Sequence, residues 1–248
     1  MRLDSTVREL YSRQIKMKEI GEAGQRRLAG ASVFVAGCGG LGAPLLYYLA
    51  AMGIGLLGLC DGDTVSLSNL NRQFLYTMED LGKPKAPAAR KRLLALNPRL
   101  DITVYDRFLD EALAGSALPA YDIAVDCLDN YRGRFILNDA CVTAGKPFVH
   151  AGIGDFYGQL MTVTPGTGPC LRCLFPHGEQ KNEGNKTFGA IGATAGVLGA
   201  MQATEVLKYL LGLPVSNDGL AIYNGLDMSL ERVAIAASPA CKCRRHHI

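Results

Sequence analysis

The chain of 248 residues has no long apolar run and no strong excess of charge of one sign. Its longest weakly polar stretch, residues 187–201, is shorter than the roughly 20 residues that cross a bilayer. Charged residues stand at the start of the chain, where a secretory signal needs an apolar core. The formal net charge of +3 does not favour a nucleic acid as partner. We therefore expect a cytoplasmic protein that uses neither membrane nor nucleic acid.

Other absences narrow the fold and the nucleotide chemistry. The sequence contains no G-x-x-x-x-G-K-[ST] motif, which excludes a P-loop ATPase. It has no internal repeat and no low-complexity linker. The apolar fraction of 48% and the charged fraction of 20% are those of an ordinary globular protein. A chain of this length buries enough surface to fold without disulfides.

The first 152 residues alternate strand and helix patterns, which predicts a parallel sheet with helices on both faces. Short helices are expected within 6–30, before the first strand. The predicted strands are 32–36, 54–60, 102–105, 121–126 and 147–152, and the predicted helices are 41–52, 85–96 and 131–144. The whole pattern indicates a Rossmann-like, doubly wound α/β fold.

After residue 152 the pattern changes. A strand at 159–164 precedes a long segment rich in glycine and proline at 165–190, and a helix is predicted at 196–211. Two late strands, 220–223 and 231–236, are expected to extend the sheet in antiparallel fashion. We expect a single domain over 1–248, made of a nucleotide-binding half at 1–152 and a second half at 153–248.

A glycine loop lies between the first strand and the first long helix. It reads GCGGLG at 37–42 and fits G-x-G-x-x-G, whose backbone N–H groups can approach a phosphate at a helix N-terminus. Asp61 ends the next strand, where it can accept hydrogen bonds from ribose hydroxyls. Taken alone, these features indicate a nicotinamide-dependent oxidoreductase.

The residues after Asp61 favour a triphosphate instead. Arg72 and Lys85 place two cations near the ribose carboxylate, where they can neutralise a triphosphate and the departing pyrophosphate. Asp129 follows a strand of the parallel sheet, at the edge where such sheets bind ligands, and its carboxylate suits Mg²⁺. These residues predict an ATP site with magnesium.

Five collinear motifs extend over nearly the whole chain: YSRQI at 11–15, GCGGLG at 37–42, DGDTVSLSNLNRQ at 61–73, GKPKA at 82–86 and DCLDN at 126–130. Together they resemble the ThiF/MoeB/HesA family, prokaryotic relatives of the ubiquitin-activating enzymes. Within that family the chain resembles most the molybdopterin-synthase adenylyltransferases, which have about this length, and the ThiF-type sulfur-carrier adenylyltransferases.

The resemblance implies an adenylyltransferase that activates the C-terminal glycine of a small ubiquitin-like sulfur-carrier protein ending in Gly-Gly. It implies catalytic roles for Arg13, Arg72, Lys85 and Asp129, with Asp129 holding Mg²⁺. Arg13 would reach into the site of a partner subunit, so a homodimer is implied, and the second half would bind the carrier. The nucleotide contacts implied are Gly37, Gly39, Gly40, Gly42, Asp61, Ser68, Asn69, Arg72, Lys85, Asp129 and Asn130.

Eight cysteines form two groups. Cys38, Cys60, Cys127 and Cys141 stand singly in apolar segments and are expected to be buried hydrophobes. The other four form two close pairs about 70 residues apart, which predicts a Cys₄ zinc site. The ligands expected are Cys170, Cys173, Cys241 and Cys243.

The second pair departs from the family's C-x-x-C, because only one residue separates its cysteines. His246, His247 or His177 is therefore an alternative fourth ligand, and a redox role for the first pair is a rival interpretation. No cysteine occurs between Cys173 and Cys241, so no thioester-forming residue is expected and a separate sulfur donor is implied.

One hypothesis and two alternative functions remain open at this point. The loop NEGNKTFGAIGA, which precedes the late helix, is rich in glycine, and we hypothesise that it moves to admit the carrier's tail. A non-catalytic partner of an activating enzyme is disfavoured by the presence of Arg72, Lys85 and Asp129. A tRNA threonylcarbamoyladenosine dehydratase, which also uses ATP, would lack the cysteine pairs.

Overall fold

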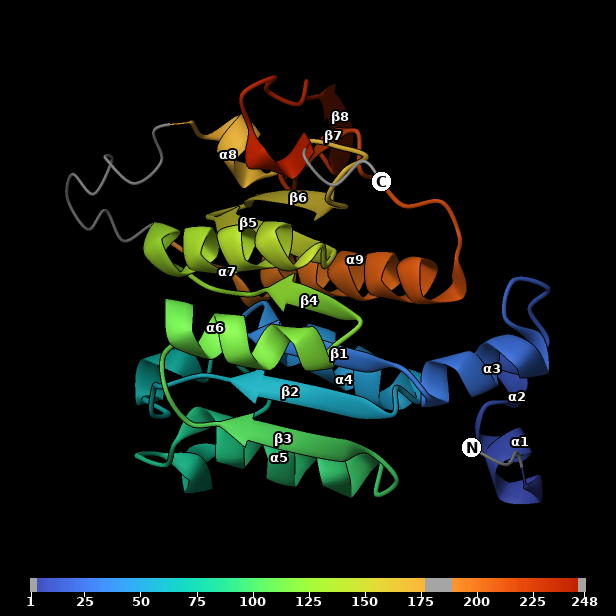
Figure 1. The fold of residues 1–248 in the computed structure, drawn as a ribbon. Helices are drawn as coiled ribbons and strands as arrows, with labels where there is room; N and C mark the ends of the chain where they lie inside the picture. The colour runs from blue at the N-terminus through green and yellow to red at the C-terminus, as the bar shows by residue number, and fades with distance from the viewer. Residues whose placement is uncertain (1–3, 177–188, 245–248) are drawn as a thin grey trace.

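The computed structural model describes residues 4–176 and 189–244. Its described strands form one eight-stranded sheet, in the order β3-β2-β1-β4-β5-β6-β7-β8 (Figure 1). The first five strands run parallel, and the last three are antiparallel to their neighbours. The strands are β1 (Ser32–Ala36), β2 (Leu56–Cys60), β3 (Asp101–Tyr105), β4 (Ile123–Asp126), β5 (Phe148–Gly154), β6 (Tyr157–Val163), β7 (Gly219–Asn224) and β8 (Ser229–Ala234).

This arrangement confirms the Rossmann-like, doubly wound sheet with an antiparallel extension. The chain order β3-β2-β1-β4 reverses direction between β1 and β4, which makes the carboxyl ends of those two strands a topological switch point. Figure 1 shows the arrows of β2, β3 and β4 pointing the same way, so their carboxyl ends meet at one edge.

Two apolar layers cover the parallel strands, as their sequences require. In β1 the alternate residues Val33 and Val35 belong to one buried cluster, while Phe34 and Ala36 belong to another. The first cluster is completed by α4 (Gly42–Met52), α5 (Lys85–Leu96) and α9 (Gly192–Leu211), and the second by α6 (Glu111–Ala117), α7 (Tyr131–Ala144) and α8 (Leu171–Leu174).

The remaining short elements flank this body. Figure 1 shows α1 to α3 at one end of the molecule, beside the C-terminal end of α9, and α3 contacts α9. These elements are α1 (Ser5–Leu10), α2 (Ser12–Ile15), α3 (Gly21–Ala29) and the 3₁₀ turns η1 (Leu67–Asn69), η2 (Met78–Asp80), η3 (Leu118–Ala120) and η5 (Lys242–Arg244).

Two helices differ from the sequence-based expectation. Helix α9 begins at Gly192 instead of 196, because close packing overrides the weak helix propensity of its glycine-rich start. Gly192 lies against the loop that carries Arg72, where an added Cβ would be 2.9 Å from the carbonyl oxygen of Asn71. Helix α6 was not expected from its sequence, and the side chain of Asp110 caps it by accepting a 2.7 Å hydrogen bond from Leu113 N.

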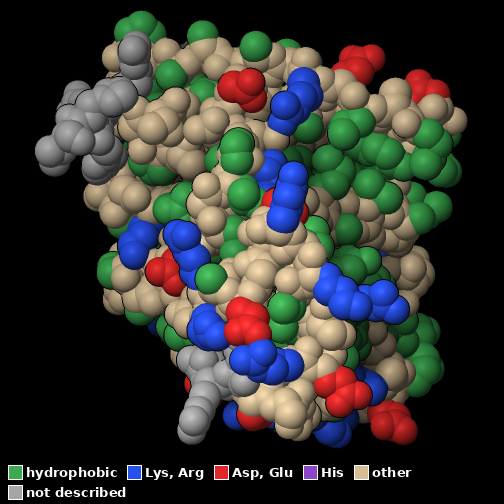
Figure 2. Space-filling model, turned by 90° about the vertical axis from the view of Figure 1, so that its right-hand side faces the viewer, with side chains coloured by type: hydrophobic (Ala, Val, Ile, Leu, Met, Phe, Trp, Pro, Cys, Tyr) green, Lys and Arg blue, Asp and Glu red, His purple; other side chains and the backbone are tan. Residues whose placement is uncertain are grey.

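The described surface agrees with the modest charge of the sequence. Figure 2 views the end of the molecule that bears α3, where Lys and Arg side chains are interspersed with Asp and Glu. No helix within the described parts of the chain is both long and apolar enough to cross a membrane.

Candidate active site

A cavity of about 530 Å³ opens at the carboxyl ends of the parallel strands. Its lining comes from the loops after β1, β2 and β4 and from the end of β5. Most of the nucleotide-site residues expected from the sequence line this cavity: Gly37, Gly39, Gly40, Asp61, Arg72, Lys85, Asp129 and Asn130.

Four expected residues do not line the cavity. Gly42 is buried in the first turn of α4, while Ser68 and Asn69 lie in η1. Asn69 accepts a hydrogen bond from Ser66 N at 3.1 Å and thereby shapes the loop that carries Arg72. Arg13 is exposed on α2, away from the cavity of its own chain.

The glycines of the loop have different structural requirements. Gly37 has φ +99°, and an added Cβ would lie 2.6 Å from the carbonyl oxygen of Cys127. At Gly42 an added Cβ would lie 2.2 Å from the carbonyl oxygen of Gly37. At Gly40 the nearest side-chain atom would be 3.6 Å away, so the fold leaves room there. Gly37 and Gly42 are therefore required by the backbone, and Gly40 keeps space free in the cavity.

Asp61 fastens the glycine loop to the end of β2. Its Oδ2 accepts a hydrogen bond from Cys38 N at 2.7 Å, and its Oδ1 accepts one from Asp63 N at 2.9 Å. Burial raises the pKa of this carboxyl group, although the two backbone hydrogen bonds oppose the shift. Each carboxylate oxygen keeps a second lone pair for a ribose hydroxyl.

The two expected cations are held by different partners. Lys85 is buried at the start of α5, and its Nζ lies 3.0 Å from Asp63 Oδ2. Arg72 is half-buried, and its Nη1 donates to Ser68 O at 2.9 Å and to Asn71 Oδ1 at 3.0 Å. Both side chains line the cavity, so an anion bound there meets two positive charges.

Asp129 extends from the loop after β4 into the cavity lining and is exposed. Its neighbour Asn130 caps α7 by accepting a 2.8 Å hydrogen bond from Gly133 N. The Nδ2 of Asn130 also donates to Asp129 Oδ1 at 3.3 Å. The capping residue thus orients the carboxylate, which suits it as a ligand for Mg²⁺.

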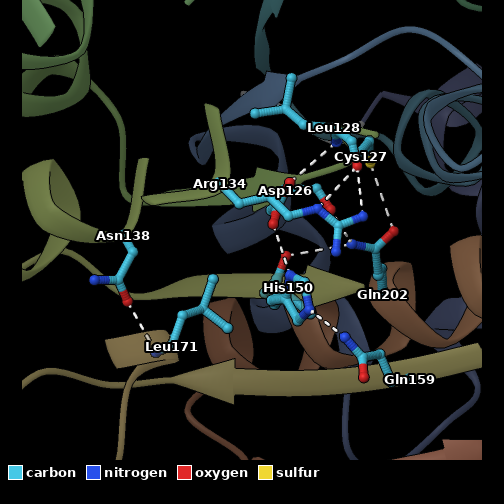
Figure 3. A network of polar contacts seen from close by, with 10 residues as sticks. Asp126, Cys127, Leu128, Arg134, Asn138, His150, Gln159, Leu171 and Gln202 are labelled. Carbon is cyan, nitrogen blue, oxygen red and sulfur yellow. Dashed lines mark hydrogen bonds and ion pairs between the residues drawn. The ribbon is translucent and has the colours of Figure 1, made fainter. Parts of the chain in front are cut away.

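A buried polar network lies beneath this loop (Figure 3). His150 Nδ1 is 2.6 Å from Asp126 Oδ2, and Leu128 N donates to Asp126 Oδ1 at 3.0 Å. Gln202, from α9, donates through Nε2 to the carbonyl oxygen of Asp126 at 2.8 Å. Burial lowers the pKa of His150, while the adjacent Asp126 opposes the shift.

The sequence analysis assigned no role to three polar residues that line the cavity, Asp63, Gln73 and Arg134. Gln73 is the last residue of the motif DGDTVSLSNLNRQ at 61–73. Its Oε1 is buried without a hydrogen-bond partner in the part of the chain that the structure describes. Arg134 lies in the first turn of α7, and a basic residue at that place was the signal available in the sequence.

The four paired cysteines meet in a second, separate cluster. Their sulfur atoms all lie within 4.8 Å of one another, with 3.4 Å between Cys170 and Cys241 and 3.6 Å between Cys173 and Cys243. Ser238 N donates to Cys173 Sγ at 3.3 Å. Burial raises the pKa of the Cys170 thiol to about 12.

The geometry of the cluster tests the two alternatives for these cysteines, a histidine as fourth ligand and a redox role for the first pair. The sulfur of Cys243 lies with the other three although only one residue separates it from Cys241. The first pair opens α8 after a loop rather than after a strand, which is not the setting of a redox pair. His177, His246 and His247 lie outside the described residues, as does most of the NEGNKTFGAIGA loop.

Comparison with known proteins gives a consistent result. The model of a family described as "ThiF family" matches residues 11–245. A "SAMP-activating enzyme E1" of Haloferax volcanii is 40% identical over 96% of this chain and 89% of its own length. A "Sulfur carrier protein adenylyltransferase" of Thermus thermophilus is 41% identical over 97% of this chain and 92% of its own.

Solved structures share the fold. The crystal structure of E. coli MccB with ATP superposes with a TM-score of 0.81 at 25% identity, covering 94% of this chain and 73% of that one.

Proposed function

Because this chain belongs to the ThiF family, we propose that it is an adenylyltransferase that activates a ubiquitin-like sulfur-carrier protein with ATP. The C-terminal glycine carboxylate of the carrier becomes an acyl-adenylate, and pyrophosphate is released. The observation that carries the proposal is that Asp61, Arg72, Lys85 and Asp129 all line the same cavity, in a chain 41% identical to a sulfur carrier protein adenylyltransferase.

Catalysis of this reaction depends mainly on positioning the two reactants and on stabilising negative charge. A C-terminal carboxylate has a pKa of about 3.5 and is ionised at neutral pH, so it needs no general base. One of its oxygens attacks the α-phosphorus of ATP, a new O–P bond forms, and the bond to the β-phosphate's bridging oxygen breaks. Pyrophosphate leaves with that oxygen.

The cavity residues take the following proposed roles. Asp61 binds a ribose hydroxyl while it holds the glycine loop, and Gly40 leaves space for the nucleotide to approach the backbone. Lys85 and Arg72 stabilise the negative charge that moves to pyrophosphate. Asp129 fits a Mg²⁺ ion because its carboxylate is exposed and oriented by Asn130, and bound magnesium would offset triphosphate charge.

The cysteine cluster fits a structural zinc ion. Tetrahedral coordination with Zn–S bonds of about 2.3 Å puts neighbouring sulfurs about 3.8 Å apart. The sulfur–sulfur distances in the pairs Cys170–Cys241 and Cys173–Cys243 are within a few tenths of an ångström of that spacing. We infer that zinc fastens the segment after β6 to the C-terminal tail, far along the chain from the nucleotide loop.

The organisation of the working enzyme follows from the same proposal. Residues 1–152 form the ATP-binding half, and 153–248 form the half that binds the carrier and carries the zinc. Arg13 enters the site of a partner subunit in a homodimer, which accounts for its exposure on α2. Because Cys173 and Cys241 enclose no further cysteine, a separate donor supplies sulfur to the acyl-adenylate.

The decisive experiment is ATP–pyrophosphate exchange with purified protein, Mg²⁺ and Gly-Gly-ending carriers, tested one at a time. Exchange that depends on the carrier is expected, with a loss of at least about 100-fold in Asp129→Ala. Asp101→Ala is the matched control, since Asp101 is an exposed carboxylate at the opposite end of the sheet. Absence of exchange with every carrier, together with NAD(H) binding, would refute the proposal in favour of an oxidoreductase.

A further inference from the structure

The guanidinium of Arg134 is a charged group in the cavity that the steps above do not use. Its Nε and Nη2 donate to the carbonyl oxygen of Leu128 at 3.2 and 2.7 Å (Figure 3), and its Cζ lies 5.9 Å from the ring of Tyr131. Within residues 4–176 and 189–244 it has no carboxylate at ion-pair distance, and Nη1 has no hydrogen-bond partner. A half-buried cation without a counter-ion calls for an anionic ligand.

The other two cations of the cavity are placed differently. Lys85 is paired with Asp63, close to the end of β2, and Arg72 lies against Gly40 of the glycine loop. Arg134 instead stands over β5, where a Cβ added to Gly152 would be 2.9 Å from its Nη1. Glycine at 152 thus makes the room that the guanidinium occupies.

The sheet order gives the distance between these places. Strands β2 and β5 are separated by β1 and β4, and adjacent strands are about 4.8 Å apart, so their carboxyl ends lie about 14 Å apart. With the ribose at Asp61 after β2, Arg134 occupies the opposite end of the cavity. That end adjoins the antiparallel strands of the half proposed to bind the carrier.

The buried carboxylate behind Arg134, Asp126, bonds to other groups and forms no ion pair with Arg134. Gln159 Nε2 lies 3.2 Å from His150 Nε2, and because an amide nitrogen only donates, His150 accepts there and donates from Nδ1 to Asp126. His150 is then neutral. Asp126 is satisfied by His150 and by Leu128 N.

We propose that Arg134 binds the C-terminal carboxylate of the incoming carrier, which extends the proposed function and rests on it. The edge formed by Nε and Nη2 donates to Leu128 O, whereas Nη1 has no partner among the described residues and can donate a charged hydrogen bond to one carboxylate oxygen. The other oxygen stays free to attack the α-phosphorus. Arg134 therefore recognises a carboxylate and leaves the attacking oxygen without a hydrogen bond from the guanidinium.

The test compares the carrier with its natural carboxylate and the same carrier ending in glycinamide. Calorimetry measures the Kd of each in the presence of AMPCPP, which prevents turnover. The wild-type protein is expected to prefer the carboxylate by about 10- to 100-fold, the effect of one charged hydrogen bond. Arg134→Gln should bind both forms alike, and Arg134→Lys should keep part of the preference. Arg132→Gln, an exposed arginine on the same helix, is the matched control and should behave as wild type.

Two results would overturn the proposal. If Arg134→Gln keeps the wild-type preference, the carboxylate is bound elsewhere. If it weakens binding of both forms equally, or weakens AMPCPP binding instead, Arg134 serves only to hold the loop of Asp129. Either result, obtained with carrier-dependent exchange intact in the wild-type protein, leaves the proposed function standing, whereas loss of exchange in the wild type removes both.

Discussion

The glycine loop permits a prediction that separates glycines required by the backbone from those required by the ligand. In Gly37→Ala, a residue with φ near +99° costs about 1–2 kcal/mol, and its Cβ also meets the Cys127 carbonyl oxygen at 2.6 Å. In Gly42→Ala, the 2.2 Å approach to Gly37 O forces a backbone shift, for which about 1–3 kcal/mol is typical.

Gly40→Ala is the contrasting variant. Its added Cβ would make ordinary contacts of 3.6 and 3.7 Å with Arg72 and Ala195, so the free energy of unfolding should change by no more than about 0.5 kcal/mol. The same methyl group stands where a nucleotide must approach the loop, and ATP should bind about tenfold or more weakly.

Urea unfolding followed by circular dichroism measures the first quantity, and calorimetric titration with ATP measures the second. We expect Gly37→Ala and Gly42→Ala to lose stability, and Gly40→Ala to lose only affinity. The reasoning is refuted if Gly40→Ala is as unstable as Gly37→Ala, or if it binds ATP as tightly as the wild-type protein does.

Three further outcomes are expected. The purified chain should contain about one zinc ion, and Cys243→Ser should lower both the zinc content by atomic absorption and the melting temperature, whereas unchanged zinc would point to a histidine ligand. Burial raises the pKa of Asp80, but hydrogen bonds from Thr77 and Lys83 outweigh it and lower the pKa to about 2. Because the pKa of this carboxyl group is about 3.9 in the unfolded chain, its charged form stabilises the fold above about pH 4, and this stabilisation is lost as the pH falls towards 2. Asp80→Asn should therefore lower the free energy of unfolding by up to about 2 kcal/mol at pH 7. Urea unfolding should also show that the stability of this variant falls less steeply between about pH 4 and pH 2 than that of the wild-type protein. Mixing inactive Arg13→Ala with inactive Asp129→Ala should restore up to about a quarter of the exchange activity, since half of the reassorted dimers have one intact site, and no recovery would contradict a site shared between subunits.

Much of the fold was predictable because its signals are local. The apolar run of β1 ends at the glycine loop, and the helix after Asn130 begins with its own cap, so β1, α5 and α7 fall at their expected bounds. Helix α6 and the first turn of α9 were not predictable in this way. Gly192, which begins α9, packs against Asn71 and Arg72, and these lie far away in the sequence.

The residues of the candidate site likewise fall into those that the sequence predicted and those that only the structure revealed. Motifs identified Asp61, Arg72, Lys85 and Asp129: Asp61 and Asp129 follow strands, Lys85 opens a helix, and Arg72 stands in the motif that continues from Asp61. The sequence alone thus determined the fold class, the family resemblance and the main polar groups of the nucleotide site. Only the tertiary structure showed that Cys243 joins the sulfur cluster and that Arg134 lies over Gly152 without a counter-ion. The physical reason is that sulfur clustering and charge neutralisation depend on distances between segments that only the packed sheet brings together.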